Sequence, residues 1–267
     1  MKTFRRITWM MLSAMLLMAC GGGNSTASFD GLEFDSIVID TVAKLGKAQD
    51  APRCKLRLSI QYAKGEKAQK FNDTLLRSGI LAPDYFSLSD EKLSVKAILD
   101  SFVCHYVSDY LRDYGTLYQA DKEHASSYNC DFIVNTSTHD GGNNVMNYVA
   151  SIYQFGGGEH GIKQTIVKNF DMKTYRLLTL NDMFIDAKHD VLKEQIIKKL
   201  CKKFDVDSFD DLREKFIFAD GNVYLPDNFI LEDEKITFIY CEDEIAPHEM
   251  GEIRLEFDKD DLKSYMR

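Results

Sequence analysis

The stretch VMNYVASIYQFGGGEHGIKQTIVKNF, residues 145–170, determines the fold class. Apolar and aromatic residues alternate with polar ones over 145–155 and again over 161–170, which predicts two half-buried strands. Only a short glycine-rich segment separates them. Because a parallel crossover needs a dozen or more residues, these two strands are expected to pair antiparallel.

The flanking sequence adds further strands and helices to this hairpin. Alternating patterns predict strands over 56–62, 130–134, 229–231, 236–240 and 253–257. Helical spacing predicts helices over 66–78, from an N-cap within 87–90 to Gly115, over 190–204 and over 260–266. The short connections between successive strands favour an α+β fold, an antiparallel β-sheet with helices packed on one face.

The amino terminus has the three parts of a bacterial lipoprotein signal. Basic Met1 to Arg6 is followed by an apolar run over 7–19 that is too short to span a bilayer comfortably. The sequence then reads LMACG over 17–21, which resembles a lipobox. This predicts a signal peptide over 1–19 and a lipid-modified Cys20, whose acyl chains, palmitate among them, anchor the protein to a membrane.

The segment after Cys20 predicts where the protein is held. Gly21 to Thr26 is small and polar, and a flexible tether is predicted over 20–51. Gly21 is not the aspartate that retains enteric lipoproteins at the inner membrane, and no acidic run like a Bacteroidota surface-export signal follows. We therefore predict a cell-envelope protein, held at the outer membrane and facing the periplasm.

Charge and cysteine content narrow the possible partners. Removal of residues 1–19 takes the formal net charge from −9 to −12, which disfavours nucleic acid and suits a basic partner. The remaining cysteines form no C-x-x-C, so a zinc site of that kind is not predicted. These cysteines are Cys54, Cys104, Cys130, Cys201 and Cys241. Either one or two disulfides form in an oxidising compartment, or all five are small buried apolar residues.

The second half of the chain resembles the DUF3298 family. Four segments carry the resemblance: 153–161 (YQFGGGEHG), 178–184 (LTLNDMF), 229–240 (FILEDEKITFIY) and 245–251 (IAPHEMG). Glu159 stands where a small residue is usual in the family, and His248 replaces a customary tyrosine. The resemblance predicts a DUF3298-like domain at 141–267, and the region 52–140 is similar by pattern to the DUF4163 region that commonly precedes it.

This resemblance implies recognition rather than catalysis. The family includes the extracellular part of RsiV-type anti-sigma factors, a sensor that binds lysozyme, and a region of PdaC-type proteins beside a deacetylase domain. The present chain lacks the sigma-binding segment and the deacetylase domain, so neither signal transmission nor deacetylation is implied. Lysozyme binding is not implied either, because binding surfaces vary within a fold.

The glycine-rich loop has two interpretations. Glycines permit a sharp bend or a close backbone approach, so the loop is either a structural bulge or part of a ligand-facing edge. In the second interpretation 156–161 and 245–251 come together and expose polar side chains. The candidate residues are Gly156, Gly157, Gly158, Glu159, His160, Gly161, Pro247, His248 and Gly251.

The predicted function is a non-catalytic binding module that recognises a protein, such as a lysozyme-like one, or an envelope glycan. The alternative is an envelope hydrolase acting on peptidoglycan or carbohydrate, with two histidines and Glu159 as metal ligands or as acid and base. The chain has no H-E-x-x-H, G-x-S-x-G or P-loop. No catalytic residue, metal or cofactor is therefore assigned.

Overall fold

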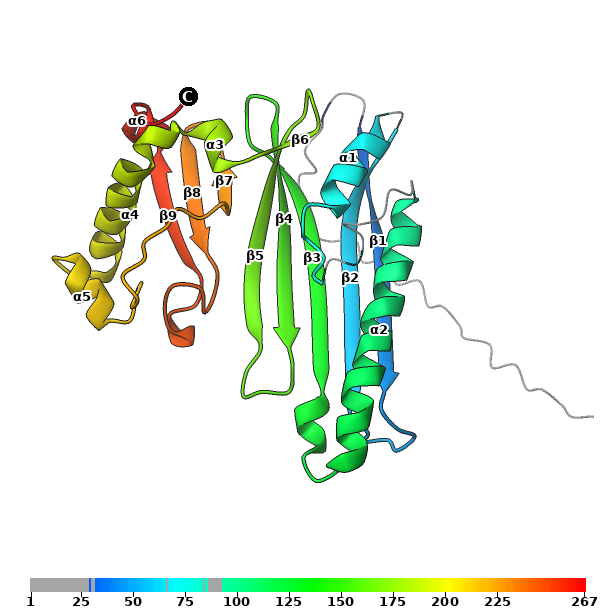
Figure 1. Cartoon of the computed structure of the whole chain (residues 1–267). Coiled ribbons are helices and arrows are strands. Elements are labelled where there is room, and N and C mark those ends of the chain that lie inside the picture. Colours follow the sequence, from blue (N-terminus) through cyan, green and yellow to red (C-terminus); the bar gives the residue numbers. More distant parts are fainter. Residues whose placement is uncertain (1–28, 30–31, 66, 84, 86–92) are drawn as a thin grey trace, which may run out of the picture.

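The computed structural model describes residue 29, residues 32–65, 67–83 and 85, and residues 93–267. Two β-sheets stand side by side, each with its own helices (Figure 1). The α+β class predicted from the sequence is confirmed. Cys20, the signal peptide and the first part of the predicted tether lie outside the described residues.

The first sheet has six strands in the order β1-β2-β3-β4-β5-β6. Their bounds are β1 Glu33–Lys44, β2 Arg53–Lys64, β3 Cys130–Asp140, β4 Val145–Phe155, β5 Ile162–Asp171 and β6 Arg176–Leu178. All neighbours pair antiparallel except β2 and β3, which run parallel. The expectation of a purely antiparallel sheet is thus wrong at one pair, because the chain from 65 to 129 is long enough to cross over.

Helices cover one face of this sheet (Figure 1). They are α1 Ala68–Leu76 and α2 Val95–Ala120, followed by the short helix η1 Ala125–Tyr128. Phe71 of α1 and Phe102 of α2 are fully buried in the same core as Phe132 of β3. Ser94 caps α2 by accepting the amide of Ala97, whereas the N-cap predicted within 87–90 lies outside the described residues. The helix also continues through Gly115, where the sequence predicted its end.

The second sheet has three strands in the order β7-β8-β9 and a core of its own. The elements of this half are α3 Leu180–Met183, η2 Asp186–Lys188, α4 His189–Phe204, α5 Phe209–Glu214, β7 Phe229–Leu231, β8 Lys235–Tyr240, η3 His248–Met250, β9 Ile253–Asp258 and α6 Lys259–Leu262. Leu192, Ile196 and Leu200 form the buried stripe of α4, at the predicted helical spacing. The predicted helix, hairpin and final strand are therefore confirmed.

Buried asparagines join the two sheets. Asn147 on β4 donates to the carbonyl of Leu231 at 2.7 Å and accepts its amide at 2.9 Å. Asn169, its register partner on β5, donates to the carbonyl of Phe229 at 2.9 Å. Buried peptide groups need hydrogen-bond partners. Here side-chain carboxamides provide the partners for β7 that the backbone of a neighbouring strand would otherwise provide.

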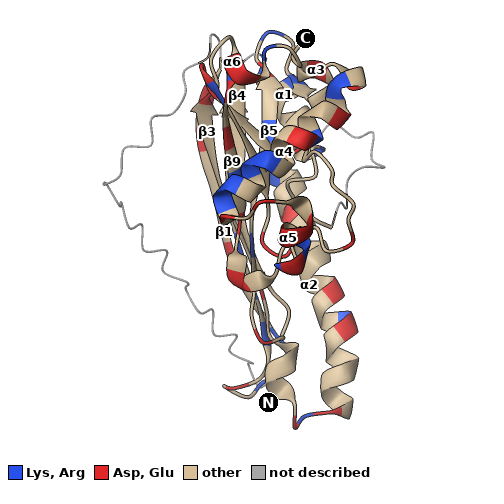
Figure 2. Ribbon diagram, turned by 90° about the vertical axis from the view of Figure 1, so that its left-hand side faces the viewer, with Lys and Arg blue, Asp and Glu red and all other residues tan. Residues whose placement is uncertain are grey.

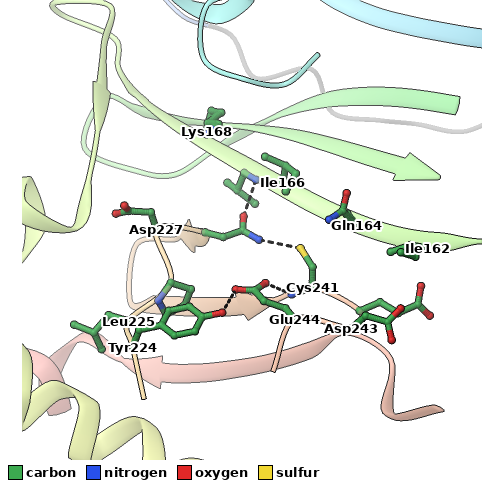
Figure 3. A pocket seen from close by; sticks show the side chains of 14 residues that line it. Ile162, Gln164, Ile166, Lys168, Tyr224, Leu225, Asp227, Cys241, Asp243 and Glu244 are labelled. Atoms are coloured by element: carbon green, nitrogen blue, oxygen red, sulfur yellow. Dashed lines mark hydrogen bonds between the residues drawn. The ribbon is translucent and has the colours of Figure 1, made fainter. Parts of the chain in front are cut away.

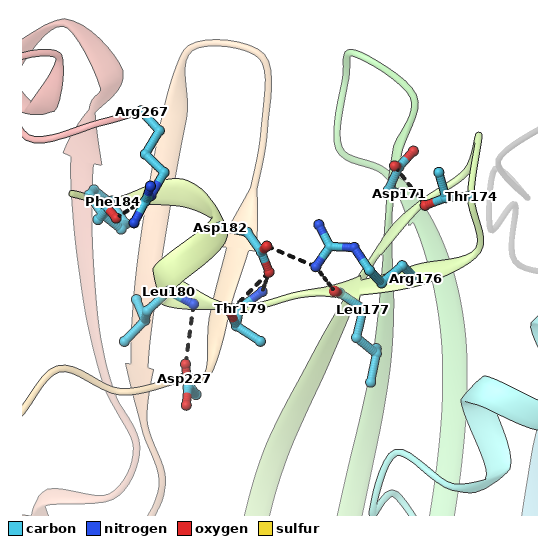
Figure 4. Close-up of polar contacts among 10 residues, drawn as sticks. All are labelled: Asp171, Thr174, Arg176, Leu177, Thr179, Leu180, Asp182, Phe184, Asp227 and Arg267. Carbon is cyan, nitrogen blue, oxygen red and sulfur yellow. Dashed lines mark hydrogen bonds and ion pairs between the residues drawn. The ribbon is translucent and has the colours of Figure 1, made fainter. Parts of the chain in front are cut away.

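The segment that leads from one sheet to the other is fastened by Asp182 (Figure 4). The Asp182 carboxylate accepts the amide and the hydroxyl of Thr179 at 2.8 and 2.9 Å, and pairs with Arg176 at 2.8 Å. The Thr179 amide holds the pKa of Asp182 below its ordinary value of 3.8. The LTLNDMF segment noted in the sequence is therefore the connection between the sheets.

Two sequence-based boundaries need correction. The predicted tether over 20–51 is wrong for 33–44, because these residues form β1 and pair with β2 over their whole length. The predicted boundary between 140 and 141 lies in the turn between β3 and β4, two strands of one sheet. The division between the two cores instead falls near Leu178.

The helices and cysteines of the described residues provide neither a membrane span nor a disulfide. Within the described ranges, no helix combines the length and the apolar character needed to cross a bilayer. The five cysteines after Cys20 are all free thiols, and Cys54 and Cys130 are register partners on β2 and β3.

Candidate functional site

Two loops that are distant in the sequence meet at one end of the sheets. Residues 156–161 connect β4 to β5, and residues 241–252 connect β8 to β9. The rings of His160 and His248 stack with centroids 3.7 Å apart and planes 11° apart. The two predicted segments therefore do come together, and their histidines are in direct contact.

The glycines of the first loop differ in how much space a side chain would have at each position. Gly157 has φ +83°, and a side chain there would overlap the carbonyl oxygen of Ser127 in η1. A side chain at Gly161 would meet the ring of Tyr153 at 2.5 Å. Gly156 and Gly158 instead have no atom within 4 Å of a built Cβ. The structural interpretation thus holds most firmly for Gly157, which faces a backbone carbonyl; Gly161 faces only the tip of a side chain, and Gly156 and Gly158 face open space.

Carboxylates on the second loop hold His248. Its Nδ1 lies 3.1 Å from Oδ2 of Asp243 and 3.7 Å from Oε1 of Glu242. The other oxygen of Glu242 accepts the amide of Lys163 on β5 at 2.6 Å, which ties this loop to the first sheet. Asp243 adopts a left-handed backbone with φ +63°. The loop therefore presents one ring and one carboxylate side by side.

The remaining predicted residues surround this pair. Pro247 precedes η3, and Gly251 ends it with φ 62° and ψ −155°, a conformation essentially reserved for glycine. Glu159 is exposed and makes no hydrogen bond or ion pair with any residue that the structure describes. The structure brings His160 and His248 together with Asp243, which the sequence reasoning missed, and leaves Glu159 outside the group.

A cleft of about 640 Å³ lies between β5 and the second half of the chain (Figure 3). The exposed edge of β5 forms one wall, and 224–228 and 241–244 form the other. Four carboxylates line the cleft against one lysine: Asp227, Glu242, Asp243, Glu244 and Lys168. Burial lowers the pKa of Lys168. The cleft is therefore predominantly acidic.

Side chains of the opposite wall occupy the edge of β5. Asn228 donates to the carbonyl of Thr165 at 2.7 Å and accepts the amide of Val167 at 2.8 Å. The Cys241 thiol also donates to the Thr165 carbonyl, at 3.5 Å. With the Glu242 contact to Lys163, these bonds occupy the edge that an added strand would use. A ligand in this cleft would contact side chains rather than extend the sheet.

The polar groups of the cleft are held by one another. Glu244 accepts the hydroxyl of Tyr224 and the amide of Cys241, both at 2.6 Å (Figure 3). Burial, followed by the Glu244 hydrogen bond, raises the pKa of Tyr224. Burial also raises the pKa of the Cys241 thiol to about 11. The thiol is therefore protonated near neutral pH and poorly nucleophilic.

Comparison with known families identifies the second half of the chain. The sequence profile of DUF3298, a protein family of unknown function, matches residues 181–260. These residues are a DUF3298 domain. The domain contains His248, Asp243 and one wall of the cleft, whereas the glycine-rich loop precedes it. The resemblance of 52–140 to DUF4163 stays a prediction.

Solved structures share the fold over most of the chain. A DUF3298 family member from Bacteroides fragilis aligns with a TM-score of 0.76 and 24% identity, over 89% of this chain and 94% of that one. A DUF3298 family protein from Pseudomonas aeruginosa PAO1 aligns with a TM-score of 0.60 and 14% identity, over 89% and 95%. No curated protein matches the chain. Both structural likenesses therefore take in the six-stranded sheet as well as the DUF3298 domain.

Proposed function

We propose that this protein is a non-catalytic recognition module of the bacterial cell envelope. A lipid on Cys20 holds it at the outer membrane with its folded body in the periplasm. Its ligand is a basic protein, which binds at the acidic cleft and the two loops beside it. The observation that carries this proposal is the meeting of 156–161 with 241–252 next to the cleft, through His160 and His248.

The distribution of charge supports a cationic ligand. The cleft has four carboxylates and one lysine, whereas lysines gather on the exposed side of α4 (Figure 2). Charge of one sign concentrated in a concave surface attracts an oppositely charged partner and speeds its association. The same distribution disfavours an anionic glycan at the cleft.

Lysozyme, a strongly basic protein, is the probe that tests this proposal. We expect the purified protein to bind it, with an affinity that falls as salt is raised from about 20 to 300 mM, because salt screens exposed charges. Asp243→Asn and Asp227→Asn should weaken binding. Glu123→Gln, at an exposed site between α2 and β3, is the matched control and should leave binding unchanged.

Three other results would each lead to a different conclusion about the proposed function. Binding that is indifferent to salt and to the cleft variants would contradict recognition at this surface. Binding of uncharged muropeptides in place of lysozyme would replace a protein ligand by a glycan. Release of peptidoglycan fragments by the purified protein would favour the hydrolase alternative.

The anchor has its own test. Cys20→Ser should leave the signal peptide uncleaved by the lipoprotein pathway. Mass spectrometry should detect acyl chains on the wild-type protein and none on this variant. Membrane fractionation of this variant should differ from that of the wild type. Unchanged processing and lipid content would contradict the anchor without affecting the cleft.

A further inference from the structure

We propose that His160, His248 and Asp243 form a binding site for a divalent transition-metal ion. Each offers one ligand atom, and the three atoms lie within 4.8 Å of one another. The site goes beyond the proposed recognition of a basic protein and does not depend on it.

The backbone supplies these ligands from two directions. His160 comes from the connection between β4 and β5, and the other two residues come from the connection between β8 and β9. Glu242 fastens the second connection to the start of β5, next to the first connection, by accepting the amide of Lys163. The ligands are thus held near one another before any ion binds, which reduces the ordering that binding requires.

The histidines have lone pairs available for an ion. Asp243 faces Nδ1 of His248, so its carboxylate lies within reach of an ion that is bound at that ring. His160 is exposed and makes no hydrogen bond to any residue that the structure describes. Its contact is the stacked ring of His248. The ring nitrogens of His160 therefore have no competing partner among the described residues.

A small movement completes the geometry. The lone pair of an imidazole nitrogen lies in the plane of its ring, and the planes of the two stacked rings are nearly parallel, so one ring must tilt for both nitrogens to face a single ion. The open space around Gly156 and Gly158 and the exposure of His160 permit that turn on the side of the first loop. Gly157 stays held against Ser127, so the adjustment is local.

The donor set indicates which ions bind. Two imidazoles and one carboxylate suit zinc, nickel or copper, whereas magnesium and calcium prefer oxygen ligands. Asp243 and the adjacent Glu242 together balance the charge of a divalent ion. Three protein ligands at an exposed surface leave further positions open to water or to a donor atom from a bound protein.

Titration of the metal-free protein with ZnCl₂ and NiCl₂ tests the site without any protein ligand. Every protein in the experiment carries Cys104→Ser, because the exposed Cys104 thiol could itself bind the added metal. We expect one ion per chain, detected by calorimetry and by elemental analysis after dialysis. His160→Ala and His248→Ala should each weaken binding by about tenfold or more, since even outer-shell changes cost 10- to 100-fold.

The matched control is His124→Ala. His124 is exposed and also pairs with a carboxylate, Asp121, at 2.8 Å, but it lacks a second histidine. This variant should bind the ion as the parent does. If His248→Ala proves unstable, metal affinity is compared between the parent and His160→Ala, because the His160 side chain is exposed. Absence of binding by the parent, or equal affinity in parent and His160→Ala, would overturn the proposal, whatever the outcome with lysozyme.

Discussion

The joint between the two sheets is closed at one end and open at the other. At the closed end, Asn147 and Asn169 are buried and hydrogen-bond to peptide groups of β7. At the open end, β5 faces the acidic cleft, and exposed loops carry His160 and Asp243. The difference teaches that the buried carboxamides hold peptide groups of β7 in place, while the polar side chains of the exposed loops are accessible to a ligand.

The largest effect on stability is expected from Asn147→Ala at the closed end. It leaves the amide and the carbonyl of Leu231 without partners in a buried place, and we expect a loss of about 3 kcal/mol in the free energy of unfolding. Asn135→Ala, exposed on β3, is the control and should change little. Urea denaturation measures both, and equal effects would contradict a structural role for the Asn147 bridge.

A smaller loss is expected from Gly157→Ala at the open end. Its positive φ and the carbonyl of Ser127 leave no room for a methyl group, so the variant should cost about 2 kcal/mol. Gly158→Ala, whose Cβ meets open space, should be close to neutral in the same denaturation experiment. A reversed order would mean that the loop is not held through Ser127.

Asp182→Asn tests the connection between the two sheets. The carboxylate caps α3 and pairs with Arg176, and its loss should cost about 1 kcal/mol at neutral pH. Because the pKa of Asp182 is lowered on folding, its stabilisation is present above the ordinary value of 3.8 and is lost as pH falls through the folded value. Stability curves of wild type and variant should therefore converge in acid. A gap that persists there would exclude the charge as its source.

The smallest effect on stability is expected from His160→Ala. The side chain is exposed, so thermal denaturation of the metal-free protein should shift by less than about 0.5 kcal/mol in free energy. A loss as large as that of Asn147→Ala would show that the open end is part of the structural joint and would remove the contrast.

Local patterns explain how much of the fold could be predicted. The hairpin of β4 and β5 and the helix α4 follow from alternation and spacing within short windows, and their bounds agree closely with the prediction. The strand β1 was missed because its alternation is interrupted between Phe34 and Ile37, after a glycine-rich segment. The parallel pairing of β2 with β3 was missed although both intervening helices were predicted, because no local window of sequence shows which strands become neighbours.

The candidate site was predicted in part for similar reasons. The two loops stood out because glycine and proline mark unusual backbone, and His160 and His248 lie within them. Asp243 belongs to the acidic run 242–244, which reads as an ordinary solvated turn. Only the packing of the second sheet against β5, through β7, brings it to His160.

The parallel pairing of β2 with β3 also has a kinetic consequence. Partners such as Leu56 and Phe132 are separated by the whole of α1 and α2, whereas β3, β4 and β5 are joined by short turns. Contacts that close long loops form late, because their entropic cost precedes their reward. The hairpin of β1 and β2 comes first in the chain and is synthesised before the rest of its sheet. Its contact with β3 is therefore expected to form later than the contacts among β3, β4 and β5.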